Sequence, residues 1–151
     1  KDVEELETEI RNGFGVSNRK ILSEKVESLR VELHEGFTPI FNYRLEAREG
    51  QKYPFGLLIF DHDILVAQVV CTSFDGKVLK VKITATFIKG SGYVQRAIEL
   101  LLISRKIDEW QSDFMTSLSS YADEMYERIA KNKNFQIGYS QDGRKSVKLK
   151  K

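Results

Sequence analysis

The sequence feature that most constrains the fold is a strand-like run that turns through two glycines into a long helix-like run. Residues 78–88 alternate apolar with polar side chains, which is the period of a half-buried strand. Residues 93–110 carry apolar side chains at helical spacing, and Gly90 and Gly92 lie between the two runs. A strand that turns directly into a helix leaves the first-turn N–H groups without partners and facing one small volume. The junction therefore predicts a site for phosphate or another anion, to which Lys89 adds positive charge.

Two segments near the start of the chain predict helices. Residues 2–12 have a sparse apolar side and are followed by a glycine-rich break. Ser17 is a typical cap for a second helix that runs to Glu35, and Gly36 ends that helix. The apolar side chains of the second segment lie near helical spacing, at Ile21, Leu22, Val26, Leu29 and Leu33.

The pattern then changes to a period of two, which predicts strands. The expected strands span residues 41–47, 53–60, 64–73 and 77–88. Asp61-His62-Asp63 is expected to close one hairpin, and Asp75-Gly76 is the strongest hairpin signal in the chain. In the last of these strands one face should pack into the core, through Leu79, Val81, Ile83, Ala85 and Phe87.

Two helices are predicted in the second half of the chain. The helix over residues 93–110 should bury one stripe, formed by Val94, Ala97, Ile98, Leu101, Leu102 and Ile107. A short strand over 114–119 separates it from a helix over 121–131, which Ser120 would cap. The inner positions of this second helix are Ala122, Met125, Tyr126 and Ile129.

A last hairpin, with strands at 135–140 and 145–149, turns at Asp142-Gly143. Antiparallel hairpins combined with one helical crossover predict an α+β fold. We expect a mixed, mostly antiparallel twisted sheet flanked by helices. A single domain would cover residues 1–151, with N-terminal helices in 1–36 and the sheet and glycine loop in 37–151.

The composition is that of an ordinary globular domain, with 41% hydrophobic and 30% charged residues. No run approaches the roughly 18 apolar residues that span a bilayer, so no membrane contact is expected. The first nine residues are mostly charged, unlike a signal peptide. The single cysteine, Cys71, excludes an internal disulfide and a cysteine cluster for zinc. These features favour a cytoplasmic protein.

The end of the chain is basic. Residues 128–151 contain eight lysines and arginines against one acidic residue, Asp142. Such a stretch fits a solvated edge strand that lysines protect from aggregation. It also fits a surface that binds the phosphates of a nucleotide or a nucleic acid.

The order of elements and the glycine junction together resemble the GNAT superfamily of N-acetyltransferases. Phe87-Ile88-Lys89-Gly90-Ser91-Gly92 stands where that family has Arg/Gln-x-x-Gly-x-Gly/Ala, between its fourth strand and a long helix. Residues 121–131 resemble the family's fourth helix, and Asn134-Phe135 stands where Gly-Phe usually opens the next strand. The resemblance covers about residues 54–149. Phe87 departs from the Arg/Gln position, and Gln95 departs from a position that is usually apolar.

This resemblance implies a transferase that moves an acetyl group from acetyl-coenzyme A (acetyl-CoA) to an amine on a small molecule or a protein. The cofactor's diphosphate would be held by the loop, at Phe87, Ile88, Lys89, Gly90, Ser91, Gly92 and Tyr93. The pantetheine arm would enter between two splayed strands, and a backbone amide of residues 84–87 would polarise the thioester carbonyl. Tyr126 would protonate the leaving thiolate. The general base stays open among Asp61, Asp63, Glu46 and water.

Several of these residues also have structural interpretations. The two loop glycines fit a plain turn without a ligand, and Tyr126 fits a tyrosine at the edge of the core. His62 between Asp61 and Asp63 fits a polar hairpin tip better than a metal ligand, so no metal site is predicted. Cys71 fits a small buried apolar residue better than a nucleophile.

Two further classes of function remain as alternatives. A non-catalytic GNAT-like binding or regulatory module is favoured by Phe87 and by the lack of an obvious base. A nucleic-acid-binding protein would use the basic C-terminal hairpin with Tyr139 and Phe135, although the sequence has no recognised nucleic-acid motif. A nuclease built on Asp75, Lys80 and Lys82 is less favoured, because a second acid is not evident.

Overall fold

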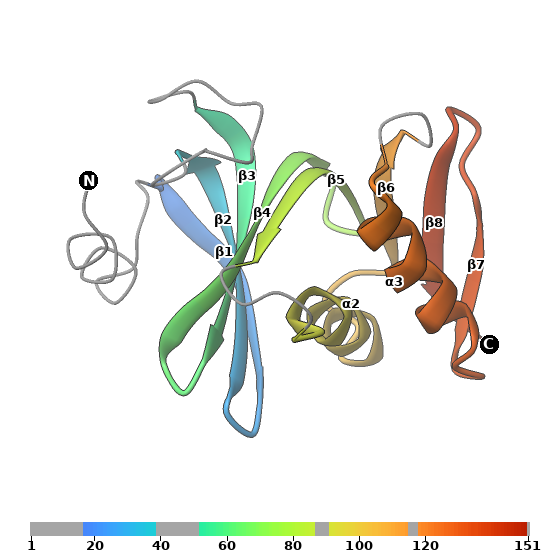
Figure 1. The fold of residues 1–151 in the computed structure, drawn as a ribbon. Coiled ribbons are helices and arrows are strands. Elements are labelled where there is room, and N and C mark those ends of the chain that lie inside the picture. Colours follow the sequence, from blue (N-terminus) through green and yellow to red (C-terminus); the bar gives the residue numbers. More distant parts are fainter. Residues whose placement is uncertain (1–16, 39–51, 87–90, 115–117, 151) are drawn as a thin grey trace.

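A computed structural model describes residues 17–38, 52–86, 91–114 and 118–150 of the chain. Eight strands form one mixed sheet in the order β1-β2-β3-β4-β5-β6-β8-β7, and two helices among the described residues complete the fold (Figure 1). The elements are β1 (Arg19–Val26), β2 (Leu29–Phe37), β3 (Tyr53–Asp61), β4 (Ile64–Phe74), β5 (Val78–Thr86), α2 (Tyr93–Ile103), β6 (Glu109–Phe114), α3 (Ser120–Ala130), β7 (Phe135–Tyr139) and β8 (Arg144–Leu149).

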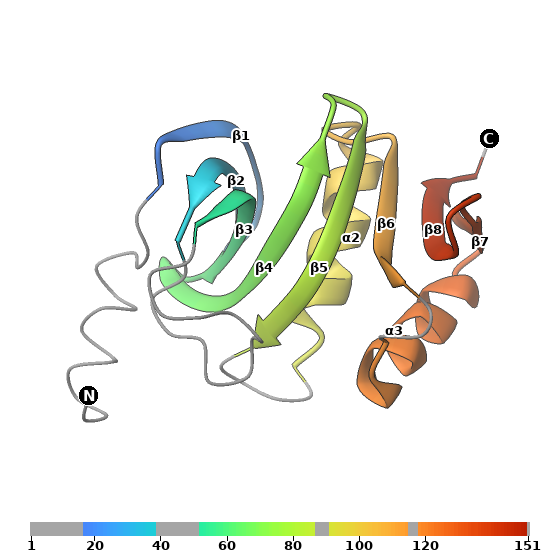
Figure 2. The same cartoon turned by 90° about the horizontal axis from the view of Figure 1, so that it is seen from above.

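All neighbouring strands in the sheet are antiparallel except β5 and β6, which run parallel. The strands twist strongly along the sheet (Figure 2). The main core lies between the sheet and both helices, and it contains Leu79, Trp110 and Val147 from three adjacent strands. The predicted mixed, mostly antiparallel sheet is therefore confirmed. The two described helices both pack on one face of it instead of flanking it.

The helix predicted from Ser17 to Glu35 is wrong, because this segment forms the hairpin of β1 and β2. The turn lies at Glu27-Ser28, where Glu27 has a left-handed φ of 54°. Leu29, Val31 and Leu33 are buried at alternate positions of β2. The apolar residues of this segment fit both periods, and pairing with β3 buries the period-two set. Tertiary burial thus overrides the helical pattern, and the sheet begins before residue 37.

The central helix α2 ends earlier than its apolar pattern predicts. Its predicted inner positions are buried, at Val94, Ala97, Ile98, Leu101 and Leu102. Arg105 then takes a left-handed φ of 59°, and the Lys106 N–H donates to the Leu101 carbonyl at 3.0 Å. This is a Schellman ending with arginine in the place where glycine is usual. Trp110, predicted in the helix, therefore lies in β6, and the strand predicted over 114–119 is wrong in its bounds.

Three predicted hairpin turns are confirmed. The turn between β3 and β4 places both His62 and Asp63 at left-handed φ, as a two-residue hairpin turn requires. Asp75-Gly76 joins β4 to β5, and Asp142-Gly143 joins β7 to β8.

Helix α3 is also predicted nearly correctly. Its cap is Ser119 rather than Ser120, and the Ser119 Oγ accepts from the Ala122 N–H at 3.2 Å. The predicted inner positions Met125, Tyr126 and Ile129 are buried.

Some predictions fall outside the described residues. These are the helix over residues 2–12, the strand over 41–47, the core position of Phe87 and the side chains of Ile83 and Ala85. Within the described part of β5, Leu79 and Val81 are buried as predicted. No helix in the described part of the chain is both long enough and apolar enough to cross a membrane.

Candidate functional site

The only parallel strand pair among the described residues, β5 and β6, forms the centre of the candidate site. The two strands pair over three residues at their amino ends, Val78–Lys80 with Glu109–Gln111. Beyond these residues they diverge toward their carboxyl ends, and α2 begins at the end where β5 stops (Figure 2). Ligands of open sheets with parallel strands bind outside the carboxyl ends of those strands. The β5–α2–β6 crossover therefore presents a binding position at this end.

Arg144 of β8 links the two diverging strands. Its Nη1 donates to the Val81 carbonyl of β5 at 3.3 Å and to the Ser112 carbonyl of β6 at 3.0 Å. Its Nε donates to the Asp142 carboxylate at 3.1 Å, and its guanidinium lies 4.2 Å from the centre of the Phe114 ring. The side chain is only 9% exposed. Arg144 thus lies where the two strands begin to diverge. Its position among the eight basic residues of 128–151 does not indicate this role.

The N-terminus of α2 lies at the same end of the strand pair. Gly92 precedes the helix with φ 74° and ψ 14°, and no side chain caps the first turn. The first turn carries no acidic residue, and a Cβ built on Gly92 would meet nothing within 4 Å. The helix dipole and the backbone N–H groups of the first turn of α2 therefore favour binding of an anion at this helix terminus. Phe87, Ile88, Lys89 and Gly90 lie outside the described residues, so their part in the loop stays a prediction.

Tyr93, predicted to bind the cofactor, contacts the turn between β3 and β4. Its hydroxyl donates to Asp61 Oδ2 at 2.5 Å, and the Ser28 hydroxyl donates to Asp61 Oδ1 at 2.6 Å. The hydrogen bond from Ser28, and then that from Tyr93, holds the pKa of Asp61 below its usual value against the opposing effect of burial. The hydrogen bond to Asp61 in turn raises the pKa of Tyr93.

The three carboxylates considered as general bases differ in their surroundings. Asp61 is stabilised as an anion by these donors, which makes it a weak base. Asp63 pairs with Arg30 Nη1 at 2.5 Å. Glu46 lies outside the described residues, and the base therefore stays open.

The Asp61 contacts predict an acid-side loss of stability. The pKa of Asp61 is lower in the folded protein than in the unfolded chain, so its stabilisation is present above the unfolded pKa of about 3.9. The stabilisation is lost as the pH falls through the folded pKa. Urea unfolding between pH 6 and pH 2 should show a steeper fall for the parent than for Asp61→Asn. Tyr93→Phe removes one of the two donors, so its stability should depend on pH less steeply than that of the parent and more steeply than that of Asp61→Asn. Parallel curves for all three proteins would contradict the role of Asp61.

Tyr126, the predicted proton donor, lies inside the core. Its hydroxyl accepts a hydrogen bond from Trp110 Nε1 at 2.9 Å, and both side chains are almost fully buried. Burial raises the pKa of Tyr126, and the Trp110 hydrogen bond only partly opposes this effect. Tyr126 thus lies within the core and not at its edge, as its structural interpretation had it, and its role as an acid stays a prediction.

Replacing Tyr126 with phenylalanine should destabilise the fold. The buried Trp110 N–H would lose its acceptor, which costs about 1–3 kcal/mol. The free energy of unfolding in urea measures this loss. Tyr121→Phe on the same helix is the matched control, because Tyr121 is 77% exposed and should change stability little. Equal stabilities of the two variants would show that the Trp110 hydrogen bond contributes nothing.

The other residues that the sequence marked have structural roles. Cys71 is buried in the core, and burial raises the pKa of its thiol. The Asp75 carboxylate accepts from the backbone N–H groups of Lys77 and Val78, which fixes a turn. No group of three metal-binding side chains gathers in the part of the chain that the structure describes.

The basic C-terminal hairpin is largely neutralised within the protein. Arg144 pairs with Asp142, Lys145 pairs with Asp123 at 2.5 Å, and Lys148 lies 3.4 Å from Glu109. Phe135, considered as a nucleic-acid contact, is 4% exposed and belongs to the core, so that assignment is wrong. Tyr139 is exposed. These ion pairs weaken the case for nucleic-acid binding.

No family model and no curated protein sequence matches the chain. The crystal structure of the N-acetyltransferase PseH from Campylobacter jejuni is similar over 64% of this chain and 67% of its own, with a TM-score of 0.42 and 17% sequence identity.

Proposed function

We propose that the protein binds acetyl-CoA or a related acyl-CoA and acts as an N-acetyltransferase of the GNAT type. The observation that carries the proposal is the divergence of parallel β5 and β6 at the end where α2 begins without a side-chain cap. One ligand that combines an anionic group with an extended polar arm would match both features.

The residues at this end fit such a cofactor. The first-turn N–H groups of α2, after Gly92, would receive the diphosphate. After Lys80, no described residue of β6 pairs with the edge of β5 that faces it. Amide groups of a pantetheine arm can pair with such an edge as an added strand does.

Acetyl transfer needs a hydrogen-bond donor to the thioester carbonyl and a proton donor to the leaving thiolate. Bound acetyl-CoA would supply an activated acetyl thioester. A main-chain amide near Thr84 would polarise its carbonyl, as donors of an oxyanion hole do. Tyr126 remains the proposed proton donor, because a tyrosine hydroxyl is protonated at neutral pH, although burial, by raising its pKa, makes it a weaker acid. The amine-bearing acceptor would be a small molecule or a protein.

A calorimetric titration of the protein with acetyl-CoA tests this proposal. We expect saturable binding, together with a rise in the thermal midpoint, because a ligand at about 100 times its dissociation constant adds about 2.7 kcal/mol of stability. Acetyl-pantetheine, which lacks the diphosphate, should bind at least about tenfold more weakly because it cannot use the α2 terminus. Absence of heat and of any midpoint shift at millimolar acetyl-CoA would overturn the proposal.

A second candidate function is a binding or regulatory module without catalysis. It is favoured by Arg144, whose guanidinium already bridges the strands where the cofactor's arm would end. Release of free thiol from acetyl-CoA in the presence of a panel of amines separates the two candidates. Cofactor binding without thiol release would support the module.

A further inference from the structure

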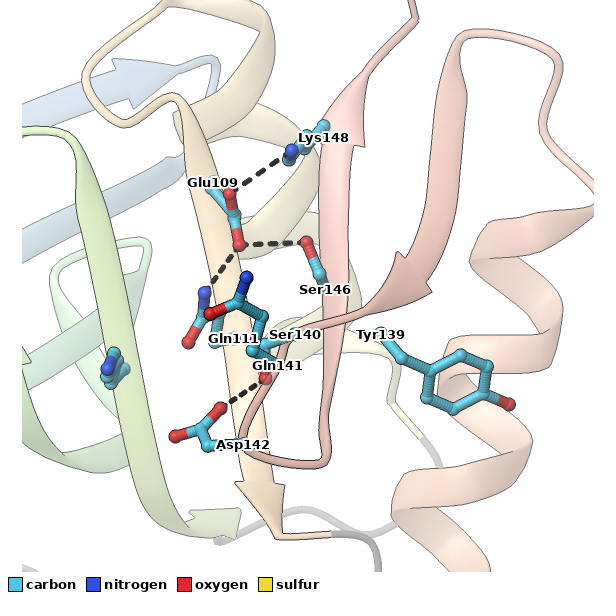
Figure 3. A pocket seen from close by; sticks show the side chains of 9 residues that line it. Glu109, Gln111, Tyr139, Ser140, Gln141, Asp142, Ser146 and Lys148 are labelled. Carbon is cyan, nitrogen blue, oxygen red and sulfur yellow. Dashed lines mark hydrogen bonds and ion pairs between the residues drawn. The ribbon is translucent and has the colours of Figure 1, made fainter.

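A polar pocket lies on the sheet face that points away from α2 and α3. Side chains alternate along a strand, so Lys80, Glu109 and Ser146 point opposite to the core residues Leu79, Trp110 and Val147. The β7–β8 turn, with Ser140 and Asp142, borders the pocket, whose volume is about 480 Å³ (Figure 3).

The Glu109 carboxylate lines the pocket and is the most strongly hydrogen-bonded group in it. Its Oε2 accepts from Gln111 Nε2 at 2.5 Å and from Ser146 Oγ at 2.9 Å, and its Oε1 lies 3.4 Å from Lys148 Nζ (Figure 3). Burial acts to raise the pKa of Glu109, yet the hydrogen bonds and Lys148 together hold that pKa below its usual value. Glu109 is therefore an anion at neutral pH and can only accept hydrogen bonds.

This anion fixes the orientation of Gln111. The amide nitrogen must face the carboxylate, so the carbonyl Oε1 points away from Glu109 (Figure 3). Gln111 is 8% exposed, and its Oε1 is buried without a hydrogen-bond partner in the described structure. A buried carbonyl without a donor is unfavourable, and a ligand that supplies a donor removes that penalty. The pocket thus selects for a hydrogen-bond donor at this point.

Lys80 supplies the second recognition element. It lies directly across from Gln111 in the β5–β6 pairing and lines the same pocket. Among the described residues its ammonium has no ion-pair partner within 4.0 Å, whereas Lys148 pairs with Glu109 and Asp142 pairs with Arg144. The Ser140 hydrogen bond and Arg144 lower the pKa of Asp142, and the charge of Lys80 adds to this effect from beyond ion-pair distance. Lys80 can therefore still pair with an anionic group of a ligand.

We infer that this pocket binds a small zwitterion that carries an amine and a carboxylate, as an amino acid does. The ammonium group would donate to Gln111 Oε1, with Glu109 and Asp142 adding negative potential, and the carboxylate would pair with Lys80. The four charged side chains that line the pocket sum to zero, which favours a zwitterion over an ion of one sign. The binding itself does not depend on the proposed acetyl transfer.

Titration of the full chain with 4-aminobutyrate, without acetyl-CoA, tests the inference by chemical-shift changes of backbone amides. Butyrate and butylamine each lack one of the two charged groups. We expect each of them to bind at least about tenfold more weakly than 4-aminobutyrate, with shifts concentrated in β5, β6 and β8. The inference would be overturned if butyrate or butylamine bound as tightly as 4-aminobutyrate, or if 20 mM 4-aminobutyrate caused no chemical-shift change.

Variants locate the binding. Gln111→Leu and Lys80→Met should each weaken 4-aminobutyrate at least about tenfold. Lys82→Met is the matched control, because Lys82 is an exposed lysine two positions further along β5 and does not line the pocket. Undiminished binding by Lys80→Met would contradict the assignment even if Gln111→Leu failed to fold. Because no acetyl-CoA is present, failure here is distinguishable from failure of the proposed function.

Discussion

Replacing Gly92 with aspartate is expected to weaken acetyl-CoA binding by at least about 100-fold, because a carboxylate would compete with the diphosphate for the same N–H groups. Gly92 precedes α2 with a φ of 74°, and the space beside it is open. The aspartate side chain would therefore occupy the proposed diphosphate position without a steric clash. Calorimetric titration of the parent and the variant measures the effect.

Two further variants separate charge from backbone strain. Gly92→Asn has nearly the same shape without the charge and tolerates left-handed φ, so it should weaken binding much less. Gly76→Asp places aspartate at another open glycine, with a φ of 95°, in the β4–β5 turn. This variant should bind acetyl-CoA as the parent does. If Gly76→Asp and Gly92→Asp lost affinity equally, the anion site would not lie at the start of α2.

Replacing Arg144 with methionine is expected to lower the free energy of unfolding by about 2–4 kcal/mol. The change removes the donor that the Val81 and Ser112 carbonyls share, as well as the contact with the Phe114 ring. Asp142 would lose its partner, but Asp142 is 44% exposed and water can solvate it. Denaturant unfolding, monitored through Trp110 fluorescence, measures the loss.

Arg144→Lys tests whether charge or geometry matters. Lysine keeps the charge but lacks the planar group that donates to two strands at once, so its stability should lie between those of the parent and Arg144→Met. Arg128→Met on α3 is the control, because Arg128 is exposed and makes one solvent-exposed side-chain hydrogen bond, from its Nε to Gln95 Oε1 at 3.1 Å, so stability should change by less than about 0.5 kcal/mol. A neutral result for Arg144→Met would show that water replaces the guanidinium at both carbonyls.

The sequence predicts best the elements whose signals are local. The turns at Asp61-His62-Asp63, Asp75-Gly76 and Asp142-Gly143 contain residues that tolerate the required backbone angles, and each turn forms as predicted. The inner faces of α2 and α3 follow directly from helical spacing. These signals need no information about distant parts of the chain.

The errors arise where two patterns fit or where the usual signal is missing. Leu29 and Leu33 lie on one face of a helix and also on one face of a strand, and only pairing with β3 decides between them. The turn at Glu27-Ser28 and the end of α2 at Arg105 use left-handed residues other than glycine. Without a glycine the sequence marks neither end, so the predicted helix continued through Trp110.

The candidate site is predictable only in part. The start of α2 at Gly92 follows from the glycine junction. Arg144 bonds to residues 63 and 32 positions away, and no local pattern indicates such contacts. The unpartnered carbonyl of Gln111 likewise depends on Glu109 and Ser146, which strand pairing brings together.

The short pairing of β5 with β6 has a mechanical consequence. The ladder joins residues 78–80 to 109–111, whereas the ladders on either side extend further. Backbone pairing is therefore shorter along this line than on either side, so a tilt of β6–β8 against β1–β5 would break few backbone pairs and would be opposed mainly by the shared core of Leu79, Trp110 and Val147. Deformation of the molecule under load or on binding would concentrate along this line, with Arg144 as the polar side chain that limits it.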